Sequence, residues 1–307
     1  MPEITEFEEK EYEQPLNHQL LLSSNNLWSP GQVFEKIFGI DSAILATEIS
    51  FWRLFGYTTI PTGTVLGNYR WNWLWRTITR SVRKFPSFKV NLLIQAKRPS
   101  YRYGINADYA KLGIKKDYWQ FKLTLHQQKI LEHLERKLGS NAFVVYACGA
   151  FHKFSDLDNY ISSGQLAANS TFVKPSKLNG HSKWVYDRPG TVGLACSKIE
   201  KQYDEDFLTQ LERLFSIVSN DKEASKDEAL KNLLELEKIS IEICNELQEK
   251  NPIAKAFIAR QKQMTVALDD YTSPNQLREP QFNIQAVRCF LSFDIFTSTL
   301  NLSWTTI

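Results

Sequence analysis

The stretch from Val90 to Pro99 constrains the fold of this chain more than any other. It opens with branched apolar residues and ends at a proline, which is typical of a buried β-strand. Strand side chains alternate between faces, so Asn91, Gln95 and Lys97 share one face. Polar groups buried on such a face cost free energy unless they find partners. The stretch therefore predicts either a functional site or a strand whose polar end emerges at the rim of the sheet.

The composition is that of an ordinary soluble globular protein, with 307 residues, 43% hydrophobic and 23% charged, enough for one large or two modest domains. No apolar run of eighteen residues occurs, so we expect no membrane-spanning helix. The acidic segment 1–14 lacks the pattern of a signal peptide. The cysteines lie far apart without a C-x-x-C pair, which favours buried thiols in a reducing cytoplasm: Cys148, Cys196, Cys244 and Cys289.

The positive charge is concentrated in one block. No acidic residue occurs between Glu48 and Asp108, whereas that interval contains ten lysines and arginines. Such a block predicts a phosphate-backbone partner, most simply DNA. The alternative is a solvated face balanced by the acidic segments 3–13 and 200–250. The candidate nucleic-acid contacts are Arg70, Arg76, Arg80, Arg83, Lys84, Arg98 and Arg102.

Apolar periodicity predicts the elements around this stretch. Residues 1–27 are interpreted as a loosely held acidic arm. Helices are expected at 30–39 and 41–55, and a strand at 57–66. The aromatic residues alternating with arginines at 69–76 suit either base stacking or a core. A strand at 118–125, a helix at 126–138 and a buried strand at 142–147 together predict an α/β unit.

The spacing of apolar residues predicts that the C-terminal third is helical. Strong helical periodicity covers 204–219 and 225–248, and a further helix is expected from 252 to about 268. We interpret 200–307 as a helical appendage with an apolar tail that is β-prone at its end. The helices of 200–270 are a candidate surface for a second copy of the chain or for a protein partner.

The tripeptide Gln95-Ala96-Lys97 resembles the Q-x-K form of the active-site strand in the PD-(D/E)xK nuclease superfamily, especially its Mrr-like restriction endonucleases. The order of elements over residues 30–150 resembles that fold too. The resemblance implies an α/β fold, namely a restriction-endonuclease-like mixed central sheet flanked by helices. It would occupy residues 28–199, with the helical appendage after it.

The resemblance also implies a function, that of a metal-dependent phosphodiesterase that cleaves DNA as an effector of defence against foreign DNA. Mg²⁺, with Mn²⁺ as the alternative ion, would be the cofactor. Lys97 would orient the attacking water, Gln95 would offer its amide oxygen to the metal, and Glu48 would be the helix acid. The family's second acid has no counterpart, because residues 49–107 contain none. The short oxygen donors within reach are Asn68, Asn72 and Asn91, of which Asn91 shares the face of Gln95. A neutral ligand in place of the acid lowers Mg²⁺ affinity.

Three explanations of the missing acid remain open: a variant ligand set, an inactivated copy, or a catalytically dead fold that binds nucleic acid or regulates a partner. A different hypothesis is a helical interaction protein whose N-terminal half is only a scaffold. Among other polar residues, His126 and the two glutamines after it mark a helix start, as an N-cap or facing the site. His152 and His181 lie in loops, where either could contact phosphate or substrate, although lone loop histidines are more often bystanders. Cys148 is interpreted as a core residue.

Overall fold

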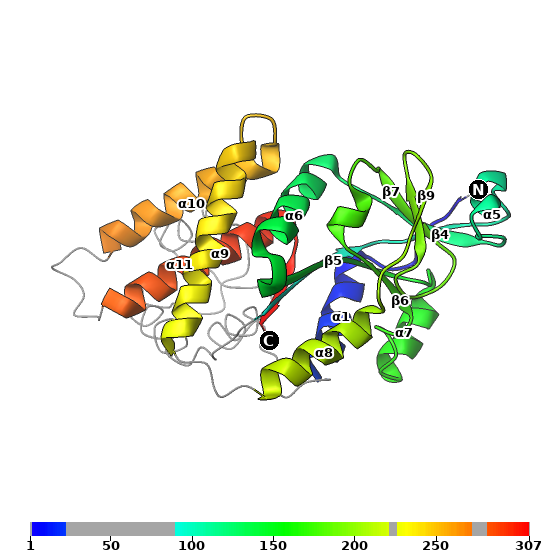
Figure 1. The fold of residues 1–307 in the computed structure, drawn as a ribbon, viewed down its shortest axis with the longest axis horizontal. Helices are drawn as coiled ribbons and strands as arrows, with labels where there is room; N and C mark the ends of the chain where they lie inside the picture. Colours follow the sequence, from blue (N-terminus) through cyan, green and yellow to red (C-terminus); the bar gives the residue numbers. More distant parts are fainter. Residues whose placement is uncertain (1, 23–89, 221–225, 272–280, 307) are drawn as a thin grey trace, which may run out of the picture. The chain divides into compact units, whose positions relative to one another are not determined.

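The computed structural model describes residues 2–22, 90–220, 226–271 and 281–306 (Figure 1). These residues divide into two compact units. The first contains 2–22 and 90–220, and the second contains 226–271 and 281–306. The helices and the strand expected between 30 and 66 lie outside the described residues.

The stretch from Val90 to Pro99 contains strand β2 (Asn91–Lys97), which is buried along its whole length. It pairs in parallel with β5 (Ala142–Gly149), so that Lys97 lies opposite Cys148. On its other side β5 pairs in antiparallel with β6 (Ser170–Val173). The predicted buried strand is thus confirmed, and the first unit is a mixed α/β structure.

A second, antiparallel sheet completes the first unit. Its order is β1-β3-β4-β7-β8-β9. The bounds are β1 (Pro2–Glu3), β3 (Ser100–Arg102), β4 (Tyr118–Lys122), β7 (Lys183–Tyr186), β8 (Gly193–Cys196) and β9 (Glu200–Gln202). The strand expected at 118–125 is β4, but it does not lie in the sheet of β5. The strand parallel to β5 is β2. The α/β unit therefore begins with β2 and not, as predicted, with the strand at 118–125.

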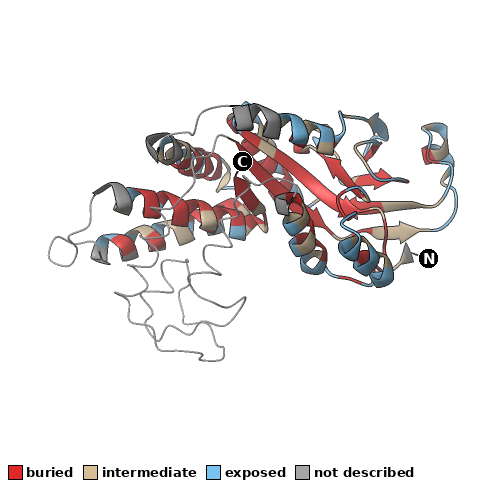
Figure 2. Cartoon of the chain, turned by 90° about the horizontal axis from the view of Figure 1, so that it is seen from below, coloured by how far each residue is buried: buried red, intermediate tan, exposed pale blue. Residues whose placement is uncertain are grey.

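Helices cover these strands. They are α1 (Glu9–Leu22), α5 (Ala107–Lys111), α6 (Leu125–Leu138), α7 (Phe154–Ser162) and α8 (Phe207–Asn220), with 3₁₀ turns at Gly139–Asn141 and Pro175–Leu178. Figure 2 shows the strands as mostly buried and the helices with exposed outer faces. The apolar positions expected for the 126–138 helix are buried in α6: Ile130, Leu131, Leu134 and Leu138. The helical spacing therefore predicted both this element and its inward face.

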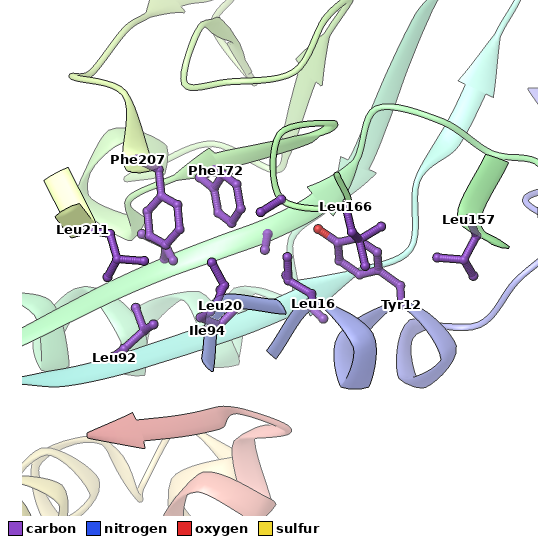
Figure 3. Packing of buried hydrophobic residues seen from close by; sticks show 14 of the residues in the cluster. Tyr12, Leu16, Leu20, Leu92, Ile94, Leu157, Leu166, Phe172, Phe207 and Leu211 are labelled. Atoms are coloured by element: carbon purple, nitrogen blue, oxygen red, sulfur yellow. The ribbon is translucent and has the colours of Figure 1, made fainter. Parts of the chain in front are cut away.

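The main core of the first unit lies between α1 and β2 (Figure 3). Leu92, Ile94 and Ala96, from one face of β2, join a buried cluster with residues of α1 and α8. The cluster includes Tyr12, Leu16, Leu20, Phe172, Phe207 and Leu211. The period-two alternation of β2 is therefore real, and its polar positions belong to the opposite face.

This core changes two interpretations made from sequence. Residues 9–22 are not a loose arm, because α1 buries Tyr12, Leu16 and Leu20 completely or nearly so. Residues 200–220 do not belong to the appendage, because Phe207 and Leu211 of α8 pack in the core of the first unit. The helical unit therefore begins after α8.

The second unit is helical, as expected. It contains α9 (Lys226–Leu247), α10 (Pro252–Tyr271) and α11 (Gln281–Leu300), which pack against one another, followed by β10 (Ser303–Thr306). Asn251 caps α10 by accepting hydrogen bonds from the backbone N–H groups of Ile253 and Ala254. Within the described ranges, none of the helices has the length and apolarity needed to cross a membrane.

Candidate functional site

The polar face of β2 is buried and paired. Gln95 is 1% exposed and Lys97 is 8% exposed. The Lys97 Nζ donates a hydrogen bond to the Oε1 of Gln127 at 2.8 Å, and the Nε2 of Gln127 donates to the Oε1 of Gln95 at 2.6 Å. The strand therefore does not expose its polar end at a sheet rim. Its polar residues satisfy one another through a side chain of α6.

Gln127 reaches this position because it lies in the first turn of α6, which runs past β5. The helix begins at Leu125 with Thr124 as its N-cap residue, so the N-cap role considered for His126 is wrong. Of the polar residues at this helix start, Gln127 contacts both Lys97 and Gln95. The sequence shows three adjacent polar residues at this helix start, but it does not show which of them faces inward.

Burial controls the chemistry of Lys97. Desolvation lowers the pKa of its amine below the usual value, and the neighbouring Glu9 and Cys148 act against that shift. The Nζ also lies 5.7 Å from the centre of the Tyr146 ring. An amine with a lowered pKa gives up its proton more readily than a surface lysine. Lysines in such surroundings occur at catalytic sites more often than elsewhere.

Glu9 is an acid of this region that the sequence analysis did not single out. It lies in the first turn of α1, and its Oε1 accepts a hydrogen bond from the backbone N–H of Arg98 at 3.3 Å. Its carboxylate also acts electrostatically on the Lys97 amine. Tyr12, Leu16 and Leu20 recur at i, i+4 spacing, which predicts a helix with one face on the core. That spacing is the sequence pattern that points to a helix carrying Glu9 in its first turn.

Asn91 does not join this group. It lies at the opposite end of β2, and six residues of strand correspond to about 20 Å between Asn91 and Lys97. Its Nδ2 donates to the backbone oxygen of Asn141 at 3.1 Å. The expectation that Asn91 supplies a metal ligand beside Gln95 is therefore not supported by its position.

The surrounding buried groups are structural. The Tyr146 hydroxyl donates to the Oε1 of Gln128 at 2.6 Å, and the Nε2 of Gln128 donates to the backbone oxygen of Pro175 at 2.8 Å. Burial raises the pKa of the Cys148 thiol well above its usual value, so this residue stays a neutral thiol. The interpretation of Cys148 as a core residue is thus supported.

The two loop histidines are held by contacts inside the protein. The Nε2 of His152 lies 3.1 Å from the Oε2 of Glu3, and its ring stacks on Tyr101 with centroids 4.1 Å apart. The Nε2 of His181 lies 3.7 Å from a carboxylate oxygen of Glu200. These contacts give each histidine a structural role in the first unit, and whether either one contacts phosphate or substrate stays a prediction.

The predicted nucleic-acid contacts are placed only in part. Arg98 is 2.7 Å from the carboxylate of Glu8 and also donates to the backbone oxygen of Thr5, so its guanidinium already has partners. Arg102 lies on β3. The remaining predicted residues lie outside the described residues: Glu48, Arg70, Arg76, Arg80, Arg83 and Lys84.

The oxygen donors near Lys97 fit a hard cation only in part. Gln95 offers an amide oxygen and Glu9 a carboxylate, which are donor types that Mg²⁺ accepts. Among the described residues, no group of three or more His, Cys, Asp or Glu side chains is placed to hold a metal ion. Mg²⁺ is commonly held by one or two carboxylates together with waters and phosphate oxygens of the substrate, so these two donors would supply only part of its coordination shell.

No family model matches this chain, and no curated protein or solved structure matches it either. The function must therefore be argued from the chemistry of the site itself.

Proposed function

We propose that this protein is a Mg²⁺-dependent phosphodiesterase that cleaves DNA, with a restriction-endonuclease-like arrangement in its first unit. The observation that carries the proposal is the buried Lys97 amine, linked through Gln127 to the Gln95 oxygen two residues earlier on the same strand. The parallel pairing of β2 with β5, and α6 between them in sequence, support the fold. Burying a lysine costs stability, and such a cost is commonly retained where function needs it.

The residues have separate tasks in the proposed reaction. Lys97 orients the attacking water through the N–H groups of its amine, which burial and the hydrogen bond to Gln127 hold in place. Gln95 would offer an amide oxygen to the cation, and Glu9 would offer a carboxylate. A bound Mg²⁺ would supply positive charge to the phosphate being cleaved. Glu48 is retained as a further acid of the proposed site, on sequence grounds alone.

A second candidate is a nucleic-acid-binding or regulatory protein with the same fold and no catalysis. The specific observation in its favour is that residues 49–107 contain no acid, which leaves the second acid of the resembled family without a counterpart. The acid-free basic block supports nucleic-acid binding in both cases.

Supercoiled plasmid distinguishes the two candidates. The full chain is incubated with plasmid in Mg²⁺ or in EDTA, and Lys97→Ala is treated in parallel. The nuclease predicts nicking that needs Mg²⁺ and is lost in Lys97→Ala. Nicking that is unchanged in Lys97→Ala would place the catalytic site elsewhere. Salt-sensitive DNA binding by wild type without any nicking would favour the second candidate.

A further inference from the structure

One side-chain amide holds both members of the Q-x-K pair. Gln127 accepts from the Lys97 amine through Oε1 and donates to Gln95 through Nε2, at 2.8 and 2.6 Å. All three side chains are more than nine-tenths buried. The residues lie 30 to 32 positions apart in the sequence, so this link depends on the packing of α6.

The planar amide makes this link directional. Its oxygen and nitrogen are bonded to the same carbon, so the Lys97 amine and the Gln95 oxygen are each held on a defined side of one rigid group. Lysine has a flexible stem of four carbons, and a fixed acceptor removes most of its rotational freedom. The Gln95 amide is fixed from its other end, because its Nε2 donates to the Ala96 backbone oxygen at 3.1 Å.

The link leaves both groups able to act. A carbonyl oxygen has two lone pairs, so the Gln95 oxygen can accept from Gln127 and still offer a second direction to a cation or water. An ammonium group has three N–H donors, of which Gln127 takes one. Gln127 can therefore set the direction of both groups without consuming either of them.

We propose that Gln127 is a positioning residue that aligns the Lys97 amine and the Gln95 oxygen for phosphodiester cleavage. The inference rests on the function proposed above, since it concerns how that site is arranged. In this role Gln127 acts through Lys97 and Gln95 and does not itself contact the phosphate. Groups that hold the side chains of a reactive site in place typically contribute about 10- to 100-fold to activity.

The neighbouring residue provides a matched control. Gln128 is buried on the same turn of α6 and also uses its amide for hydrogen bonds, but to Tyr146, Pro175 and Glu132. Gln128→Leu therefore removes a comparable buried amide without removing a contact to Gln95 or Lys97. Gln127→Glu is the conservative variant, because it keeps an acceptor for Lys97 and loses the donor to Gln95.

The first measurement does not depend on activity. In protein with ¹⁵N-labelled lysine, the Nζ–H signal of Lys97 is assigned by its disappearance in Lys97→Met. Slow proton exchange, caused by the buried hydrogen bond, should keep that signal visible in wild type, in Gln127→Glu and in Gln128→Leu. It should broaden or vanish in Gln127→Leu. If the Lys97 Nζ–H signal is equally strong in Gln127→Leu and Gln128→Leu, Gln127 does not hold the Lys97 amine and the proposal is wrong.

The second measurement is the rate of Mg²⁺-dependent DNA cleavage. We expect Gln127→Leu to lower kcat by about 10- to 100-fold with KM for DNA nearly unchanged, and Gln127→Glu to lie between it and wild type. Gln128→Leu should remain near wild type.

The two measurements separate the failures of the two proposals. Cleavage by wild type that is equally fast in Gln127→Leu overturns the positioning role and leaves the nuclease standing. If the wild-type protein does not cleave DNA, the proposed nuclease function is wrong. The catalytic role proposed for Gln127 is then wrong too, even if the Nζ–H signal of Lys97 still depends on Gln127.

Discussion

Two adjacent glutamines show what a single residue contributes to this protein. Gln127 and Gln128 are both buried, yet one contacts Lys97 and the other contacts Tyr146. Their difference comes from the turn of about 100° between neighbouring helix positions, which directs them to different strands and loops. The alternation of β2 predicted that Gln95 and Lys97 share a face. It did not predict their partner, because that partner comes from another element.

Asp294 provides a residue-scale prediction in the second unit. Burial raises the pKa of its carboxyl from 3.8 to about 6, and Arg260 acts against that shift. A raised carboxyl pKa means that the folded state holds the proton more tightly than the unfolded state. The stabilisation contributed by the protonated Asp294 carboxyl is complete below its pKa in the unfolded state. It is lost as the pH rises through about 4 to 6.

Asp294→Asn should therefore be more stable than wild type at neutral pH and lose that advantage in acid. One pKa unit corresponds to about 1.4 kcal/mol, so we expect the advantage to grow by about 1–3 kcal/mol between about pH 4 and pH 8. Urea unfolding at both pH values measures it, with the exposed Asp269→Asn on α10 as the control. An advantage that does not change with pH would contradict the buried ionisation.

At the scale of elements, α1 connects the core to the site. The same helix that buries Leu16 against the cluster containing β2 carries Glu9 in its first turn. Leu16→Ala should lower the free energy of unfolding by about 2–5 kcal/mol, since it leaves a cavity at a fully buried position. Gln14→Ala, on the exposed side of α1, should change it by less than about 0.5 kcal/mol. Similar values from urea unfolding would show that α1 is not part of the core.

The elements also show where sequence patterns stop being informative. Helical periodicity found α6, α9 and α10, because each has an apolar stripe set by its own residues. It missed α1, where charged residues and Pro15 interrupt the pattern and where burial depends on α1 packing against β2. Sheet membership was likewise not local. The alternation of β4 predicts a strand, but only the partner strands decide which sheet it joins.

At the scale of the whole molecule, the basic block predicts an electrostatic mode of DNA binding. The logarithm of the binding constant should fall linearly with the logarithm of salt concentration, by about 0.9 for each phosphate contact. Replacing Arg83 and Lys84 together by Gln should reduce that slope by about 1 to 2. The adjacent exposed pair Lys115 and Lys116, replaced in the same way, is the control. Fluorescence anisotropy between about 50 and 200 mM salt measures the slope. Equal slopes for both double variants would show that the basic block does not contact DNA.

The candidate site combines residues that the sequence keeps far apart. Gln95 and Lys97 were found from one strand, but Gln127 and Glu9 come from α6 and α1. Glu48 lies outside the described residues, so the complete set of acids is still a prediction from sequence. Long-range packing, which no local pattern encodes, decides which of these groups meet.

The central claim is that the end of β2 performs the hydrolysis. The most direct test is the single-turnover rate of Mg²⁺-dependent cleavage of a short DNA duplex, with enzyme in excess, for wild type, Lys97→Ala and Lys122→Ala. Lys122 is an exposed lysine of β4 and controls for loss of positive charge. We expect Lys97→Ala to lose at least about 100-fold in rate, as typically follows from the loss of a group that orients a reactant, while Lys122→Ala keeps the wild-type rate. Equal rates for all three proteins, or no cleavage by wild type, would contradict it.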